Sequence, residues 1–179
     1  MTATPMLSLV DRSSFRENAG IVVQIRIRVA SETDATSVRG FLAGLSVEAA
    51  YLRFFTGLGS VSPHLVRTLV RVTPRQDVAI ALDESAVIAH AMATTVDPGV
   101  VEIAVVVGDR HRRQGIATRL LADLLERATE RGARQLRLEV LSENSLVLDW
   151  IRRSLPQARL ERDGTTMTGY ADLPLREPA

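Results

Sequence analysis

Cationic residues gather at one point of this chain, between an apolar run and a helical pattern. The segment begins with three valines, Val105–Val107, and continues Gly-Asp-Arg-His-Arg-Arg-Gln-Gly-Ile-Ala-Thr. The valines favour a strand, and the apolar spacing after Gly115 predicts an amphipathic helix. The first N–H groups of a helix have no partner within it and attract anions, helped by the helix dipole. Arg112 and Arg113 add formal charge, so the segment predicts a phosphate-binding site.

Gly115 lets the backbone approach a bulky phosphate, because glycine carries no Cβ. Two better-known phosphate loops are excluded. No Gly-Lys-Ser/Thr follows, as a Walker-type loop requires, and the three glycines of a dinucleotide loop are missing. The plain alternative is a strand, a turn and a helix that carry a solvated arginine cluster.

The elements around this segment predict an α/β (α+β) domain. Alternation and short apolar runs predict strands at 24–29, 77–82, 86–95, 100–107, 135–141, 159–162 and 165–173. Helical spacing and caps predict helices from Ser31 to about 45, and at 47–55, 64–71, 114–132 and 142–153, the last capped by Ser142. In the first strand Ile25, Ile27 and Val29 should face inward. These elements predict a mixed, mostly antiparallel sheet of about six to seven strands flanked by helices.

Length and composition fit one domain over residues 21–179, preceded by a polar tail at 1–20. The net charge of +1 and 4% aromatic content disfavour a nucleic-acid-binding module. The absence of cysteine excludes a thiolate nucleophile and a zinc–thiolate site, and three scattered histidines form no metal-binding pattern. No apolar run suits a membrane span or a signal peptide. We therefore expect a cytoplasmic protein, monomer or homodimer, without a metal, nucleic-acid or membrane partner.

The cationic segment resembles the acyl-CoA pyrophosphate loop of the GNAT superfamily of N-acetyltransferases. That loop has Arg or Gln, two residues, Gly, one residue, then Gly or Ala; here it reads Arg112-x-x-Gly115-x-Ala117. The order of elements is similar to the GNAT fold over about 25–173. The segments at 51–55 (Tyr-Leu-Arg-Phe-Phe) and 101–104 (Val-Glu-Ile-Ala) resemble the bacterial protein-lysine, or Pat-like, type. The resemblance implies a sheet with a splayed parallel pair of strands at the acyl-CoA site.

Acetyl-CoA is the co-substrate that the resemblance implies, and an amine, a protein lysine first, is the acceptor. The implied contacts to the cofactor comprise the pantetheine-binding backbone, the phosphate loop and an asparagine beside the pantetheine. In this sequence they are Val105, Val106, Val107, Arg112, Arg113, Gln114, Gly115, Ile116, Ala117, Thr118 and Asn144.

The resemblance places the catalytic glutamate at Glu102, which interrupts an otherwise apolar strand. A lysine-type amine with a pKa of about 10.4 is roughly one part in a few thousand neutral at pH 7, so a carboxylate that accepts its proton speeds the reaction. Glu139 is the rival base, and an outward-facing strand residue is the plain alternative for either. Without cysteine, direct attack of the amine is expected rather than an acyl-enzyme.

One departure from the family pattern concerns the leaving thiolate. Many relatives carry a tyrosine seven residues after the asparagine, where this chain has Ile151. The missing phenol leaves open a non-catalytic, acyl-CoA-binding regulatory domain. An acetyltransferase that acts on a small-molecule amine is the other alternative.

Overall fold

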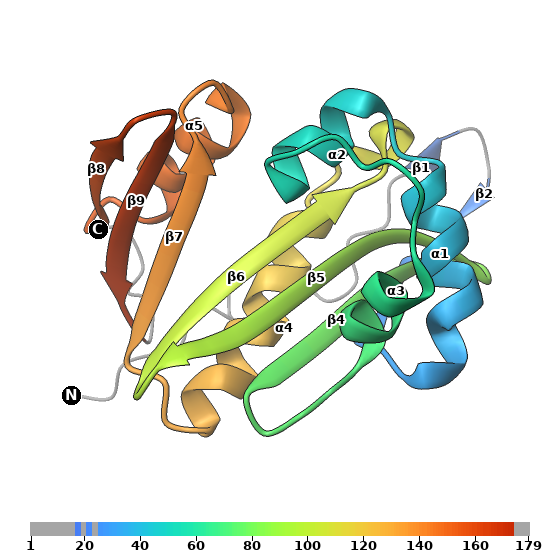
Figure 1. The fold of residues 1–179 in the computed structure, drawn as a ribbon, viewed down its shortest axis with the longest axis horizontal. Helices are drawn as coiled ribbons and strands as arrows, with labels where there is room; N and C mark the ends of the chain where they lie inside the picture. The colour runs from blue at the N-terminus through green and yellow to red at the C-terminus, as the bar shows by residue number, and fades with distance from the viewer. Residues whose placement is uncertain (1–16, 19–20, 23–24, 174–179) are drawn as a thin grey trace.

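Seven strands of the computed structural model form one twisted sheet (Figure 1). The structure describes residues 17–18, 21–22 and 25–173. The strands lie in the order β3-β4-β5-β6-β7-β9-β8. They span β3 Ile25–Val29, β4 Gln76–Asp83, β5 Ala86–Asp97, β6 Val100–Val107, β7 Gln135–Leu141, β8 Arg159–Asp163 and β9 Thr166–Asp172. All neighbours are antiparallel except β6 and β7, which confirms the predicted mixed sheet.

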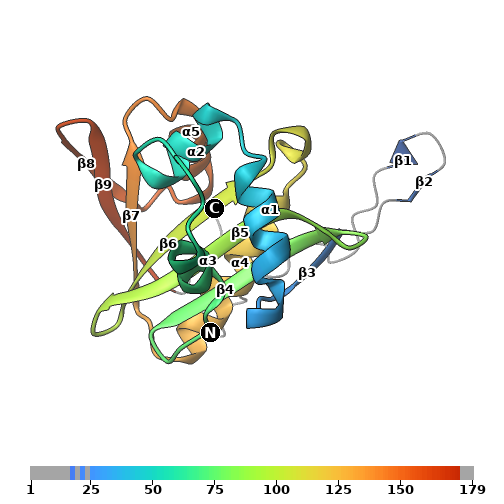
Figure 2. The same cartoon turned by 45° about the vertical axis from the view of Figure 1, so that its right-hand side comes forward.

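In the described part of the chain, five helices cover the two faces of the sheet (Figure 2). They are α1 Ala35–Ala43, α2 Val47–Phe54, α3 Pro63–Val70, α4 Ile116–Glu130 and α5 Ser145–Ser154. α1 and α3 pack with Phe54 of α2 on one face, and α4 and α5 pack on the other. Two short 3-10 turns, Glu32–Asp34 and Asp109–His111, precede α1 and α4.

Side chains alternate between the two faces along each strand, and their size on a face determines how closely a helix can pack there. On β4 and β5 most of the side chains toward α4 are alanines that are buried completely or nearly so. Small side chains let a helix lie close to the sheet, so α4 can fill this face with its leucines. The alanines are Ala79, Ala81, Ala89, Ala91 and Ala93. The opposite face carries larger side chains, among them Val78, Ile80 and Leu82, which pack against α1 and α3.

The parallel pair β6 and β7 separates after a short ladder. Three residues, Val100 to Glu102, pair with Gln135 to Arg137, and the remaining residues of β6 have no partner on β7. β7 continues to pair with β9 as far as Leu141. The two strands therefore diverge toward their carboxyl ends, where α2 and α5 lie on either side of the gap (Figure 1).

The N-terminal tail predicted at 1–20 lies mostly outside the described residues. Within the part that is described, β1 Glu17–Asn18 pairs with β2 Ile21–Val22 as a small antiparallel ladder. The sequence patterns did not predict this ladder.

Two local predictions are wrong. α5 begins at Ser145 with Asn144 as its N-cap, not at Ser142. The Ser142 N–H donates instead to Thr165 O at 2.8 Å, so Ser142 still belongs to the β7–β9 ladder. Val29, expected to face inward, is 42% exposed because it ends the edge strand β3.

Candidate active site

At the gap between β6 and β7, backbone N–H and C=O groups of β6 have no hydrogen-bond partner on β7. Gly108 N–H donates to Ile88 O at 2.9 Å, which fixes the alternation of the antiparallel β5–β6 ladder. By that alternation Val106 pairs its backbone with β5, while Val105 and Val107 direct theirs toward the gap. Of the three valines predicted to bind pantetheine, these two therefore have the backbone groups that can do so.

The predicted phosphate loop lies at the end of β6 and leads into α4. Gly115 is the N-cap of α4 with φ of 74°, and Arg113 has φ of 61°. The first bond of the helix runs from Arg119 N–H to Gly115 O, so the N–H groups of Ile116, Ala117 and Thr118 have no partner within the helix. The loop thus presents three donors and the positive end of a 15-residue helix. Arg113 and Gln114 beside them are exposed.

Arg112 is turned toward acidic residues rather than toward open solvent. Its guanidinium lies 2.8 Å from Asp109 and 4.0 Å from Glu48. Asp109 in turn accepts a hydrogen bond from Ser46 Oγ at 3.1 Å. Ser46 caps α2, so this chain of contacts ties the phosphate loop to the start of α2.

Glu102 lies at the point where β6 and β7 separate. It is the last β6 residue in the parallel ladder, and its side chain is 33% exposed. Its register partners are Thr94 on β5 and Arg137 on β7, so the three side chains share one face of the sheet. Arg137 Nε lies 3.6 Å from Glu102 Oε2, too far for a hydrogen bond. The carboxylate is therefore open to a further partner.

The rival carboxylate, Glu139, lies on the same face two residues further along β7. Its Oε2 accepts from Arg137 Nη2 at 3.3 Å, and its side chain is 34% exposed. One arginine thus stands between the two candidate bases and contacts both.

Arg53 comes from α2, which packs against β6 on this face. Its Cζ lies 4.8 Å from the centre of the Phe54 ring. Burial lowers the pKa of Arg53 to about 10, while the negative charge of Glu102 acts in the opposite direction. Arg53 therefore remains a cation at neutral pH. The sequence analysis missed it, because nothing in the spacing links residue 53 to residue 102.

His90 is a buried structural residue. Its Nε2 donates to Leu69 O of α3 at 2.7 Å, and only 1% of the residue is exposed. Burial lowers its pKa to about 4, with a smaller contribution from the charge of Arg53. The ring is thus neutral at pH 7 and joins β5 to α3 through a single hydrogen bond.

The residues around the start of α5 are arranged by capping and packing. The Asn144 Oδ1 accepts from Val147 N–H at 3.3 Å, which leaves the amide nitrogen of its side chain for a ligand. Ile151, at the position of the absent tyrosine, is 1% exposed and belongs to the core under α4. α5 therefore supplies no phenol at that position.

Tyr51 connects the two sides of the gap. The Glu143 carboxylate lies close enough to the Tyr51 phenol to raise its pKa. Tyr51 belongs to α2 above β6, and Glu143 follows β7. The contact therefore crosses the mouth of the gap between the two strands.

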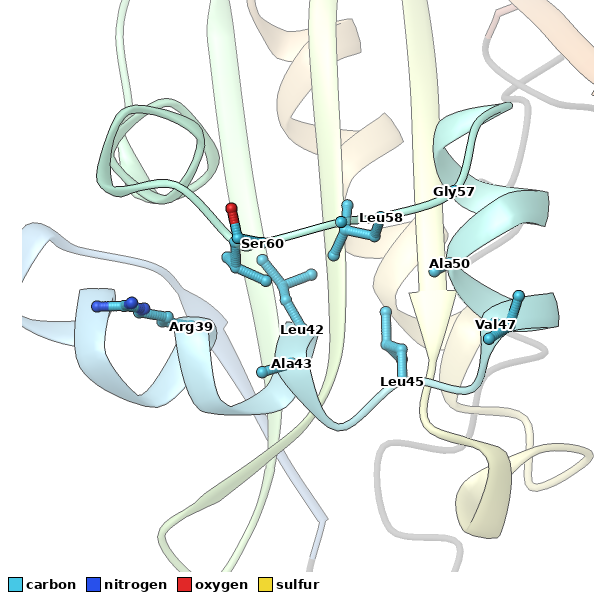
Figure 3. Close-up of a pocket in the computed structure, with 11 residues that line it drawn as sticks. Arg39, Leu42, Ala43, Leu45, Val47, Ala50, Gly57, Leu58 and Ser60 are labelled. Carbon is cyan, nitrogen blue, oxygen red and sulfur yellow. The ribbon is translucent and has the colours of Figure 1, made fainter.

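A separate cavity of about 300 Å³ lies between α1 and the chain that connects α2 to α3 (Figure 3). Leu42, Leu45 and Leu58 line it with other mostly apolar side chains. None of the predicted site residues contributes to its wall. It is distinct from the gap between β6 and β7.

Comparison with known proteins agrees with this geometry. The Acetyltransferase (GNAT) family model matches residues 40–153, which include the gap, the phosphate loop and Glu102. The chain belongs to the GNAT family. A search of curated protein sequences gave no match.

Solved structures similar to this GNAT protein share its fold. The GNAT domain of S. lividans PAT has a TM-score of 0.76 at 24% identity, covering 83% of this chain and 90% of that one. The PaiA N-acetyltransferase of Thermoplasma acidophilum, in complex with coenzyme A, has a TM-score of 0.64 at 15% identity, covering 83% and 98%. A cAMP-binding acyltransferase from Mycobacterium smegmatis has a TM-score of 0.55 at 22% identity, covering 84% of this chain but 44% of that one.

This GNAT protein is therefore an acyl-CoA-dependent N-acetyltransferase, and GNAT enzymes use acetyl-CoA. The free backbone groups of β6, the unpaired N–H groups at the start of α4 and the exposed cations of the loop fit such a co-substrate. Within the described ranges no helix is long and apolar enough to cross a membrane.

Proposed function

We propose that the chain transfers the acetyl group of acetyl-CoA directly to a primary amine, with Glu102 as general base. The observation that carries this proposal is the position of Glu102. It lies where the strands separate, partly exposed and with no hydrogen bond from the described residues. A carboxylate there can accept the proton of an amine that enters from the α2 side of the sheet.

The residues have separate roles in this reaction. Val105 N–H would donate to the carbonyl oxygen of the thioester as negative charge develops on it. The loop at 112–118 would hold the pyrophosphate, and Asn144 would contact the pantetheine. The amine nitrogen forms the new C–N bond, its proton passes to Glu102, and the C–S bond breaks. Because the position of Ile151 offers no phenol, the departing thiolate takes its proton from water.

The sequence resemblance makes a protein lysine the first acceptor class to test. The sequence resemblance at 51–55 and 101–104 to the protein-lysine type supports it, as does the similarity to the PAT domain in fold. A small-molecule amine is the second class. The buried cation of Arg53, which forms no ion pair with the described residues, favours it, because a lysine side chain brings no negative charge to that place.

Release of CoA thiol from acetyl-CoA tests the transfer itself. We expect release that depends on an added amine, in a panel of lysine peptides, amino acids, polyamines and aminoglycosides. Mass spectrometry of candidate proteins should show site-specific acetyl-lysine above the non-enzymatic background if the acceptor is a protein. Tight acetyl-CoA binding without release for any amine would instead identify a regulatory acyl-CoA-binding domain.

A further inference from the structure

The guanidinium of Arg53 has one complete edge without a partner. Nε and Nη2 are both buried, and neither makes a hydrogen bond to any residue that the structure describes. In a guanidinium the N–H bonds of these two atoms point the same way, so together they match the two oxygens of a carboxylate. Buried donors without partners are rare in folded proteins, because each loses its hydrogen bonds to water.

Arg53 also forms no ion pair at contact distance with the described residues. Among the described residues no carboxylate oxygen lies within 4.0 Å of its nitrogens. Arg137 differs in this respect, because it contacts both Glu139 and Glu102. A buried cation without a counter-ion is costly, and an anionic ligand would remove that cost.

Further unpartnered atoms lie beside Glu102 on the same face of the sheet. Five buried side-chain atoms of the described residues have no hydrogen bond, and four of them belong to Arg53, Thr94 and Arg137. Thr94 and Arg137 are the register partners of Glu102. Unmet hydrogen-bonding capacity is therefore concentrated around the proposed general base, where the acceptor must bind.

We propose that the Nε/Nη2 edge of Arg53 binds a carboxylate of the acceptor, so that the acceptor is a small primary amine that carries its own carboxylate. This inference rests on the proposed acetyl transfer with Glu102 as base. It selects the small-molecule class over a protein lysine. A lysine side chain ends in an amine after four methylenes and carries no carboxylate that could pair with Arg53. The Nε/Nη2 edge of Arg53 is buried, and the charge of Glu102 acts on it. An amino acid carries its amine and its carboxylate on one carbon, so it can offer the amine to Glu102 and the carboxylate to Arg53.

Matched acceptors test the inference on the full chain without any mutation. Each amino acid of a panel is compared with its own carboxamide, which keeps the amine and removes the negative charge. We expect kcat/KM for at least one amino acid to exceed that for its amide by about 100-fold, the scale of a buried charge pair losing one partner. Calorimetry with the same pairs, in the presence of CoA, should show binding of the acid and not of the amide.

Variants of Arg53 test whether its Nε/Nη2 edge causes the preference for the amino acid over its amide. Arg53→Gln should lower kcat/KM for the acid by about 100-fold and leave the value for the amide within a few-fold. Arg53→Lys, which keeps the charge and loses the fork, should fall between Arg53→Gln and the native protein. Arg67→Gln, an exposed arginine on the neighbouring helix α3, is the matched control and should change neither. Thermal unfolding and CoA affinity report whether each variant is folded.

The outcomes separate this inference from the proposed function. Equal turnover of acid and amide, or efficient turnover of lysine peptides that is insensitive to Arg53→Gln, would overturn the carboxylate site and leave acetyl transfer standing. Equal losses for acid and amide in Arg53→Gln would show that Arg53 acts on Glu102 and not on the acceptor. Acid-selective binding without turnover would support the carboxylate site and overturn the catalytic proposal.

Discussion

Glu102 is partly exposed and lies where β6 and β7 separate, so an amine can approach its carboxylate, as a general base requires. Glu102→Gln should keep acetyl-CoA affinity and lower kcat by roughly 10²–10³. The residual rate should rise toward alkaline pH, where more of the amine is neutral. Steady-state CoA release measured from pH 6 to 10 would check both effects.

Glu139→Gln is the matched control for this experiment, because Glu139 contacts the same arginine at similar exposure. Its kcat should stay within a few-fold of the native value. If Glu139→Gln shows the larger loss and Glu102→Gln is unaffected, the assignment of the base must move to Glu139.

At the scale of elements, the start of α4 is the part on which we expect cofactor binding to depend. Gly115→Glu should abolish acetyl-CoA binding, because a negative side chain would stand where the pyrophosphate is expected. The position has φ of 74°, so any side chain also costs about 1–2 kcal/mol of backbone strain.

Gly115→Ala separates these two effects, because it adds the strain without the charge. Apart from its neighbours, no atom of the described residues lies within 4 Å of a Cβ placed there, so the alanine variant should fold and retain most of the affinity. Calorimetric titration of both variants with acetyl-CoA makes the comparison. Normal binding by a folded Gly115→Glu protein would contradict the assignment of the loop.

A buried network of charged residues joins β4 to the C-terminal end of α4. Asp77 is 2% exposed and accepts from Arg127 Nε at 2.7 Å and from Arg131 Nη2 at 2.5 Å. Burial opposes its ionisation, but the two arginines outweigh burial and lower the pKa of Asp77. Asp77→Asn should reduce the free energy of unfolding by about 3 kcal/mol, as expected for breaking a buried charge network.

Urea denaturation measures this loss. Asp149→Asn is the control, since Asp149 pairs with Arg152 at 2.8 Å while both side chains are more than half exposed. An exposed pair of this kind contributes about 1 kcal/mol or less. Equal effects of the two variants would mean that the Asp77 network adds nothing beyond a surface contact.

At the scale of the whole molecule, His90 should make folding stability depend on pH. Its pKa is about 4 in the folded protein and 6.5 when unfolded, so the unfolded chain takes up the proton first. The folded state is therefore fully stable above about pH 6.5 and loses stability as the pH falls toward 4. The expected loss is about 3 kcal/mol, from a shift of this size at 1.36 kcal/mol per pKa unit.

Denaturation curves from pH 7 to pH 4 measure this dependence. His90→Gln retains a donor for Leu69 O and cannot titrate, so its stability should vary much less over this range. His64→Gln, at an exposed position on α3, should keep the native pH dependence. A native protein equally stable at pH 7 and pH 4 would show that burial of His90 carries no such cost.

The sequence by itself determined the elements and the position of the segment that we expect to bind phosphate. Period-two and period-3.6 patterns are local, so the strands, the helices and the loop from Val107 to Thr118 could be read from neighbouring residues. Where a local reading was wrong, a non-local contact was the cause. The Ser142 N–H bonds to Thr165 O, next to the start of β9, so Ser142 does not begin α5. Val29 is exposed because its strand lies at an edge of the sheet.

Only the tertiary structure decided which side chains meet at the acceptor side of the sheet. Strand register places Thr94 and Arg137 beside Glu102, and the packing of α2 on β6 brings Arg53 within range of the same carboxylate. Arg53 and Arg137 lie far in the chain from the β5–β6 hairpin that carries Thr94 and Glu102, so no spacing in the sequence relates them to it. The same register makes Val106 pair with β5 and leaves Val105 and Val107 free, a distinction that three consecutive valines do not carry.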